Sequence, residues 1–196
     1  MFIDTVPEES AAGALAEFYQ QQRNAWGFLP NFAGVFSARP EVAKAWNLLN
    51  KTVRDGMDRR RFEIATIGAA RALRSTYCTA AHSKFLRDEC GDEPTMVAIA
   101  EDPSGAGLSE QDRAVLQFAG QVARDASSVQ QDDVDALREL GLTDADVADI
   151  VFAAAARSFF TRVLDGLGAQ LDVETAGTFD ADVLASMVVG RPVADA

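Results

Sequence analysis

The residues best suited to chemistry lie in one segment of the chain, RFEIATIGAARALRSTYCTAAHSKFL, which begins at Arg61. The chain of 196 residues contains one histidine, His82, and two cysteines, Cys78 and Cys90. Because Cys78 and His82 are four residues apart, on one helix they would lie on the same face, one turn apart, in contact directly or through one water. This spacing suits a histidine that acts as general base toward a thiol.

Ser75 is expected to cap the helix that carries both residues. Cys78 would then be the third residue of that helix, where free amide groups and the positive end of the helix dipole favour a thiolate. We therefore expect the pKa of Cys78 to lie below about 7.5. The alternatives are a cysteine buried as a small apolar residue and a histidine that only forms a structural hydrogen bond. Cys90 follows in RDECGDEP among acidic residues and is expected to be an unactivated thiol.

Glu63 is the acidic residue of the segment, fifteen positions before Cys78. An unbroken helix would separate the two by about 22 Å, so the helix must break for them to meet, and residues 74–76 are the expected break. A fold-back there would bring Glu63 beside Cys78 and His82, where a carboxyl group suits a proton shuttle. Pairing with Arg71 or Arg162 would instead make Glu63 a structural residue.

The elements that must position these residues are helices, since apolar residues recur at spacings of three and four and strictly alternating runs are almost absent. We expect one all-α domain over residues 1–196, with a core at about 20–172 and a C-terminal arm at 173–196 that packs on a partner subunit. The Phe-rich segment 27–40 is expected to be a packed connection or pocket wall, and 101–110 the main flexible link. Helices are predicted at 8–25, 40–55, 58–73, 76–88, 94–101, 110–126, 130–140 and 144–167.

Composition excludes several classes of function. The chain has 18 Lys and Arg against 30 Asp and Glu, a net charge of −12, which repels nucleic acids and anionic membranes. Three Cys and His residues are too few for a four-ligand Cys/His zinc site, so we expect no metal and no cofactor. No leader or membrane span is evident in the sequence, and we expect a cytoplasmic protein.

The chain resembles the carboxymuconolactone decarboxylase and alkylhydroperoxidase D-like superfamily, in particular its peroxidase-related branch, over about 20–172. The resemblance rests on the segment above and on GFLPNF, ARPEVAKAWNLL, LSEQDRAVLQFAGQVA and FFTRVLDGLGAQLD. The family motif is a Glu, then a C-x-x-C whose first cysteine is twelve residues on, then a His four residues after the second cysteine. Glu63, Cys78 and His82 fit this motif. The resemblance implies an all-helical fold, homo-oligomers and a Glu–His relay that activates Cys78 toward peroxides.

Ser75 occupies the position of the first motif cysteine, so this chain cannot form the family's disulfide there. An oxidised Cys78 would need an external thiol for recycling. The first hypothesis is therefore a peroxidase-like oxidoreductase with a single reactive thiol, acting on a hydroperoxide, with Tyr77 and Arg71 as candidate pocket residues. The alternatives are a cofactor-free decarboxylase or isomerase of a small carboxylic or lactone substrate, which uses His82 and Glu63, and a non-catalytic member of the family.

Overall fold

The computed structural model describes residues 1–195, and this part of the chain is helical without strands, as the sequence predicts. Its only β-type pairing is an isolated bridge between Leu171 and Val193. None of the described helices is long and apolar enough to span a membrane. The helices are α1 (Ala14–Trp26), α2 (Asn31–Val35), α3 (Pro40–Asp55), α4 (Arg59–Ala72), α5 (Thr76–Asp88), α6 (Glu93–Glu101), α7 (Glu110–Asp125), α8 (Gln131–Glu139), α9 (Asp144–Leu167), α10 (Val173–Ala176) and α11 (Ala181–Met187).

The helices from α3 to α9 begin and end within one residue of the predicted ranges, because their caps are encoded locally. Ser109 accepts a hydrogen bond from the Asp112 amide at 3.1 Å, and Thr143 and Asp146 form a reciprocal capping box. The prediction of a first helix over 8–25 is wrong at its start. Residues Glu8–Ser10 form a separate 3-10 turn. Gly13, with φ of 56°, interrupts the helical conformation before α1.

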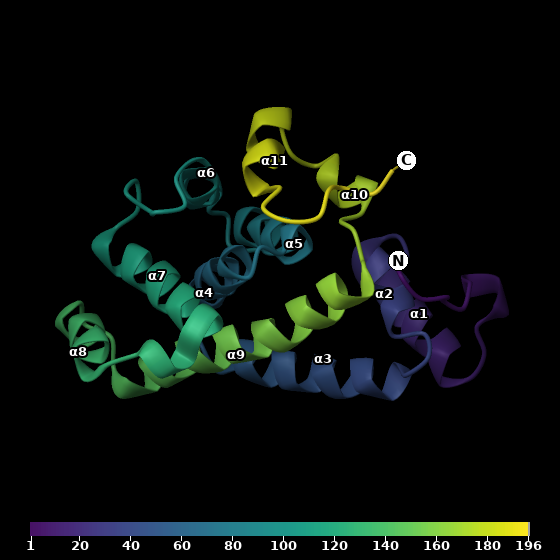
Figure 1. Ribbon diagram of the computed structural model, residues 1–196, viewed down its shortest axis with the longest axis horizontal. Helices are drawn as coiled ribbons and strands as arrows, with labels where there is room; N and C mark the ends of the chain where they lie inside the picture. The colour runs from purple at the N-terminus through teal and green to yellow at the C-terminus, as the bar shows by residue number, and fades with distance from the viewer. Residues whose placement is uncertain (196) are drawn as a thin grey trace.

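Helix α4 forms the centre of the core and packs against α5, α7 and α9 (Figure 1). Its residues from Phe62 to Ala70 are all buried. Gly68 allows α7 to approach closely, since a Cβ atom there would lie 2.3 Å from the Leu116 carbonyl oxygen. The side chains of α4 therefore reach two different sides of the molecule from a rigid, buried position.

The chain reverses between α4 and α5, as the fold-back hypothesis requires. Arg74 has a left-handed φ of 58°, the only positive φ among the described non-glycine residues, and the Ser75 amide donates to the Ala70 carbonyl at 2.9 Å. The C-terminal segment closes over this turn, because the Gly190 amide donates to Thr76 Oγ1 at 3.0 Å. Helices α4 and α5 thus lie against each other with their sequence-adjacent ends fixed.

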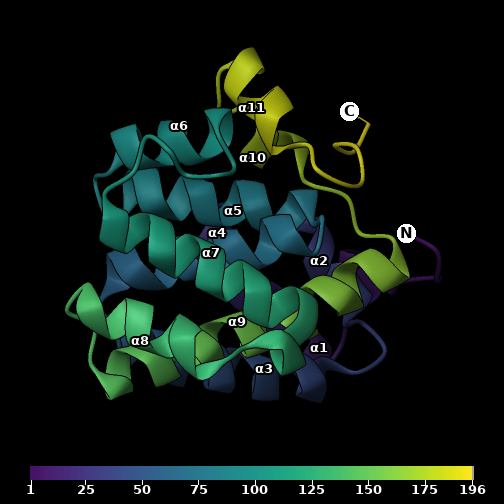
Figure 2. The same ribbon diagram turned by 60° about the vertical axis from the view of Figure 1, so that its left-hand side comes forward.

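Helix α9 is the longest element and crosses the molecule beside α3 (Figures 1 and 2). The segment that follows it, predicted as an arm, packs on its own chain: Met187 in α11 is fully buried, and α11 contacts α5 and α6. Contact of this segment with a partner subunit remains a prediction. The stretch predicted as a flexible link forms ordered turns, because the Asp102 carboxylate accepts from the amides of Ser104 and Ala106.

Candidate active site

Cys78 and His82 line a common cavity of about 180 Å³ between α1, α2, α3, α5 and α9. Cys78 is 1% exposed and His82 6%, so a reactant must enter this cavity to reach either residue. The walls are largely aromatic, with amide and guanidinium groups among them. They consist of Gln22, Trp26, Phe32, Trp46, Asn47, Asn50, Arg54, Tyr77, Cys78, Ala81, His82, Phe85, Arg157 and Phe160.

Glu63 lies beside His82, as the fold-back predicted. Its Oε2 atom is 2.5 Å from His82 Nδ1, and both residues are buried. The partner of Glu63 is neither Arg71 nor Arg162 but Arg59, one turn earlier on α4, whose Nη2 lies 2.8 Å from Oε1. This contact is an ion pair without hydrogen-bond alignment, since Oε1 has no hydrogen-bond partner. Because a carboxylate only accepts, Nδ1 carries the hydrogen and donates it to Glu63.

His82 is neutral at pH 7. Burial and, to a lesser degree, the nearby Arg157 guanidinium lower the pKa of His82 from its ordinary 6.5 to about 4, against the opposing effect of Glu63. With Nδ1 committed to Glu63, the unprotonated Nε2 is the free lone pair of the ring. The arrangement therefore provides an oriented imidazole that can accept a proton in the cavity.

Cys78 lies beside a buried guanidinium that the sequence did not reveal as a site residue. Arg157 Nη1 is 3.7 Å from Cys78 Sγ, and Arg157 Nη2 donates to Asn50 Oδ1 at 3.3 Å. The expected low pKa of Cys78 is not found: burial raises the pKa of this thiol above its ordinary value, while Arg157 and Ser75 lower it. The first turn of α5 would lower the pKa of Cys78, but the loss of solvent raises this pKa by more, so Cys78 is a neutral thiol at rest.

Ser75 occupies the N-cap position of α5, but its side chain does not cap the helix. Its Oγ is buried without a hydrogen-bond partner. The hydroxyl is close enough to the Cys78 thiol and to the Asp165 carboxyl to lower the pKa of each. The expectation of a side-chain cap from Ser75 is therefore wrong.

The two candidate pocket residues lie in different places. Tyr77 lines the Cys78 cavity, and its hydroxyl donates to the Asp172 carboxylate. Burial and the charge of Asp172 raise the pKa of Tyr77 well above its ordinary value, so Tyr77 is a neutral wall residue. Arg71 is absent from this cavity and lines another, on the opposite side of α4.

Cys90 does not lie near the Cys78 thiol. Both cysteines are free, and α5 continues unbroken from Cys78 to Asp88, a length of about 15 Å. Burial raises the pKa of the Cys90 thiol, which fits the unactivated thiol predicted for this position.

Sequence reasoning missed Arg59 and Arg157, the charged residues that contact Glu63 and Cys78. Arg157 is an arginine within the Ala-rich buried helix α9, and such a residue must find polar partners inside the protein. An arginine in such an apolar helix was therefore the one sequence feature that could have marked Arg157 as a site residue. Arg59 lies at the half-buried start of α4, where nothing in the sequence distinguishes it from Arg60 and Arg61.

Comparison with known proteins supports the superfamily indicated by the motif. Residues 40–120 match the model of the Carboxymuconolactone decarboxylase family. A peroxidase-related protein with an alkylhydroperoxidase AhpD core from Ralstonia eutropha JMP134 has a TM-score of 0.77 and 21% identity, with 97% of each chain covered. A peroxidase-related protein from Silicibacter sp. TM1040 has a TM-score of 0.72 and 20% identity, covering 89% of this chain and 91% of that one.

The same fold occurs in a debrominase. A cysteine-to-alanine variant of the debrominase Bmp8, in complex with 2,3,4-tribromopyrrole, has a TM-score of 0.72 and 18% identity, covering 93% of this chain and 94% of that one. No curated protein matches the chain. At these identities the solved structures establish the fold that this chain shares.

Proposed function

We propose that this chain, whose residues 40–120 match the Carboxymuconolactone decarboxylase family and whose fold is that of AhpD-like proteins, is a peroxidase-like oxidoreductase with a single reactive thiol, Cys78. The observation that carries the proposal is that a thiol, a neutral imidazole and a buried guanidinium line one cavity. Neutral His82 is the general base, Glu63 orients it, and Arg157 supplies positive charge 3.7 Å from the sulfur.

The reaction begins with a neutral thiol. As a hydroperoxide enters, the Cys78 proton passes to His82 Nε2 directly or through a water, because no hydrogen bond joins the two residues in the described part of the chain. The sulfur attacks the nearer peroxide oxygen, an S–O bond forms and the O–O bond breaks. The departing alkoxide takes the proton from His82, so the products are a sulfenic acid and an alcohol. Arg157 stabilises the negative charge on sulfur during the attack.

Recycling uses a thiol from outside the chain. The hydroxyl of Ser75 cannot reduce a sulfenic acid, and Cys90 is too distant. One external thiol condenses with the sulfenic acid to give a mixed disulfide and water. A second external thiol releases Cys78 as the free thiol and leaves as the external disulfide.

A second candidate function is a cofactor-free decarboxylase or isomerase of a small carboxylic or lactone substrate. The observation that favours it is Arg157, which is 3% exposed and has no carboxylate partner among residues 1–195. A substrate carboxylate could fill that role, with His82 and Glu63 moving the proton.

Turnover of cumene hydroperoxide with dithiothreitol as external thiol tests the first candidate. We expect Cys78→Ser to abolish turnover, and His82→Gln to lower it by about 10²–10⁴-fold because general-base catalysis is lost. Cys90→Ser is the matched control and retains activity. Hydroperoxide turnover that survives Cys78→Ser would contradict the thiol reaction.

A further inference from the structure

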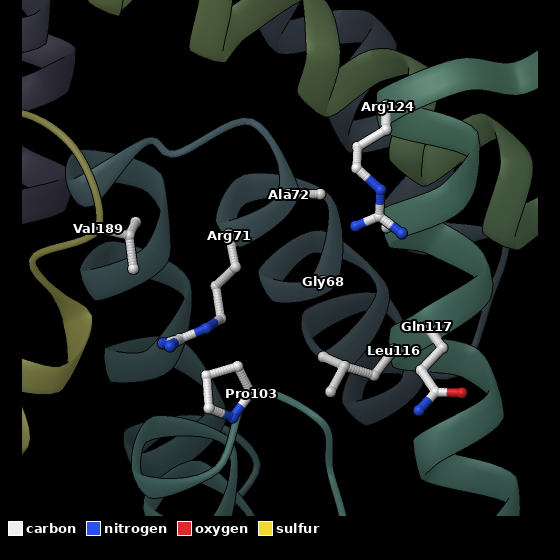
Figure 3. Close-up of a pocket in the computed structure, with 9 residues that line it drawn as sticks. Gly68, Arg71, Ala72, Pro103, Leu116, Gln117, Arg124 and Val189 are labelled. Atoms are coloured by element: carbon white, nitrogen blue, oxygen red, sulfur yellow. The ribbon is translucent and has the colours of Figure 1, made fainter.

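A second cavity, of about 360 Å³, lies on the side of α4 opposite the Cys78 cavity. It is formed by α4, α7, the loop that precedes α7 and the C-terminal segment (Figure 3). The residues that line it are Gly68, Arg71, Ala72, Pro103, Leu116, Gln117, Gly120, Arg124 and Val189. No residue is shared with the Cys78 cavity, so this is a separate space.

The charged groups of this cavity are both positive. Arg71 extends from α4 toward Pro103 and Val189, and Arg124 extends from α7 toward α4 (Figure 3). Among residues 1–195, neither arginine has a carboxylate within ion-pair distance, although nine of the chain's other arginines do; these nine are Arg23, Arg39, Arg54, Arg59, Arg60, Arg61, Arg87, Arg138 and Arg191. In a chain of net charge −12, two unpaired cations at one cavity are unexpected.

Arg71 is incompletely satisfied by the protein. Its Nη1 donates to the Ser186 carbonyl at 3.2 Å, but its Nε is buried without any hydrogen-bond partner. Burial lowers the pKa of Arg71, and no neighbouring carboxylate offsets this effect. A partly buried guanidinium in this condition gains stability from an anion that supplies the missing acceptors.

The remaining walls are apolar or small. Leu116, Pro103 and Val189 offer contact to an apolar group beside the two guanidinium groups. The volume is in the range of cavities that hold small molecules. We propose that this cavity binds a small organic anion, with a carboxylate or phosphate group on Arg71 and Arg124 and an apolar portion against Leu116.

Isothermal titration calorimetry at constant ionic strength tests the proposal with four probes: benzoate, phenyl phosphate, inorganic phosphate and benzyl alcohol. Both ring-bearing anions are expected to bind, and benzyl alcohol is not, since it lacks the charge. A preference for benzoate or for phenyl phosphate identifies the anionic group. Inorganic phosphate is expected to bind more weakly than phenyl phosphate, because it lacks the apolar portion. The absence of binding by either ring-bearing anion would overturn the proposal.

Variants locate the binding. Arg71→Met is expected to weaken binding about tenfold or more because charge-assisted hydrogen bonds are lost. Arg124→Gln should weaken it severalfold, and since Arg124 is exposed, this variant also serves if Arg71→Met does not fold. Arg162→Gln, an exposed and unpaired arginine of α9, is the matched control and leaves binding unchanged. Equal weakening in this control, or a loss confined to Arg157→Gln, would contradict the proposed site.

Discussion

The pairing of Glu63 with His82 determines how the histidine can act. The carboxylate accepts the hydrogen bond from Nδ1 and so fixes the tautomer, while burial keeps the ring neutral with a pKa of about 4. In the neutral ring, Nε2 is free to accept a proton. At rest the Cys78 proton nevertheless stays on the sulfur, because burial also raises the pKa of the thiol. Cys78 and His82 are therefore both neutral at rest, and both protonation states follow from the same burial.

His82 also makes stability depend on pH in a defined window. Its pKa is 6.5 when unfolded and about 4 when folded, so between these values the unfolded state binds a proton that the folded state does not. Stability is unaffected above about pH 6.5 and falls as the pH drops toward 4, by about 3 kcal/mol for a shift of this size. Urea unfolding of the wild type and His82→Gln from pH 4 to pH 7 measures the difference. His82 is the only histidine of the chain. If the free energy of unfolding depended on pH equally in the two proteins, the lowered pKa of His82 would be contradicted.

Helix α4 serves both cavities, since Glu63 contacts His82 of the Cys78 cavity and Arg71 lines the second cavity. Its place depends on small residues at the contact with α7, above all Gly68. The sequence predicted the ranges of most helices because capping and apolar spacing are local signals. It missed α2, α10 and α11, which have seven residues or fewer and are held by tertiary contacts.

Substitution of Gly68 by Ala tests the close contact of α4 and α7. The added Cβ atom would lie 2.3 Å from the Leu116 carbonyl oxygen, so the helices must separate, at a cost of about 3 kcal/mol in the free energy of unfolding. Gly166→Ala is the matched control in helix α9, where the new Cβ meets nothing within 4 Å and stability should rise by about 0.5–1 kcal/mol. Chemical denaturation measures both. Equal stability of Gly68→Ala and wild type would show that the contact is not tight.

The candidate site was predictable in part, for reasons specific to each residue. The spacing of Glu63, Cys78 and His82, together with the break near Ser75, indicated a site that the fold brings together. The charge beside the sulfur was not predictable, because Arg157 lies 79 residues along the chain from Cys78. The charge beside Glu63 was not predictable either, because Arg59 stands among neighbouring arginines in the sequence. The pKa of Cys78 was misjudged because the degree of burial depends on five packed helices rather than on position in one.

At the scale of the whole molecule, α3 and α9 carry a group of exposed apolar side chains. Leu48 and Leu49 on α3, and Phe152 and Phe159 on α9, are between 44% and 69% exposed. These two helices pack together, and Phe159 stacks on Trp46, a wall residue of the Cys78 cavity. Exposed apolar groups of this kind are typical of interfaces between subunits, which agrees with the expected homo-oligomer.

Size-exclusion chromatography with light scattering measures the oligomeric state of the protein directly. We expect the wild type to be a homo-oligomer at micromolar concentration, and Phe152→Glu to shift it toward the monomer because a charge would be buried at the interface. Ile3→Glu alters an exposed apolar residue of the N-terminal segment, which is not part of the group on α3 and α9, and should leave the mass unchanged. A wild-type protein that is monomeric throughout would exclude this interface.

The proposed reaction of Cys78 with peroxide is tested most directly by trapping the sulfenic acid with dimedone after mild peroxide treatment, followed by peptide mass spectrometry. We expect dimedone to label Cys78 in the wild type and in Cys90→Ser, and to label it much more slowly in His82→Gln and in Arg157→Gln. Cys90, an unactivated thiol, should remain unlabelled under the same conditions. A Cys78 that stays reduced in the presence of peroxide would contradict the proposed thiol chemistry.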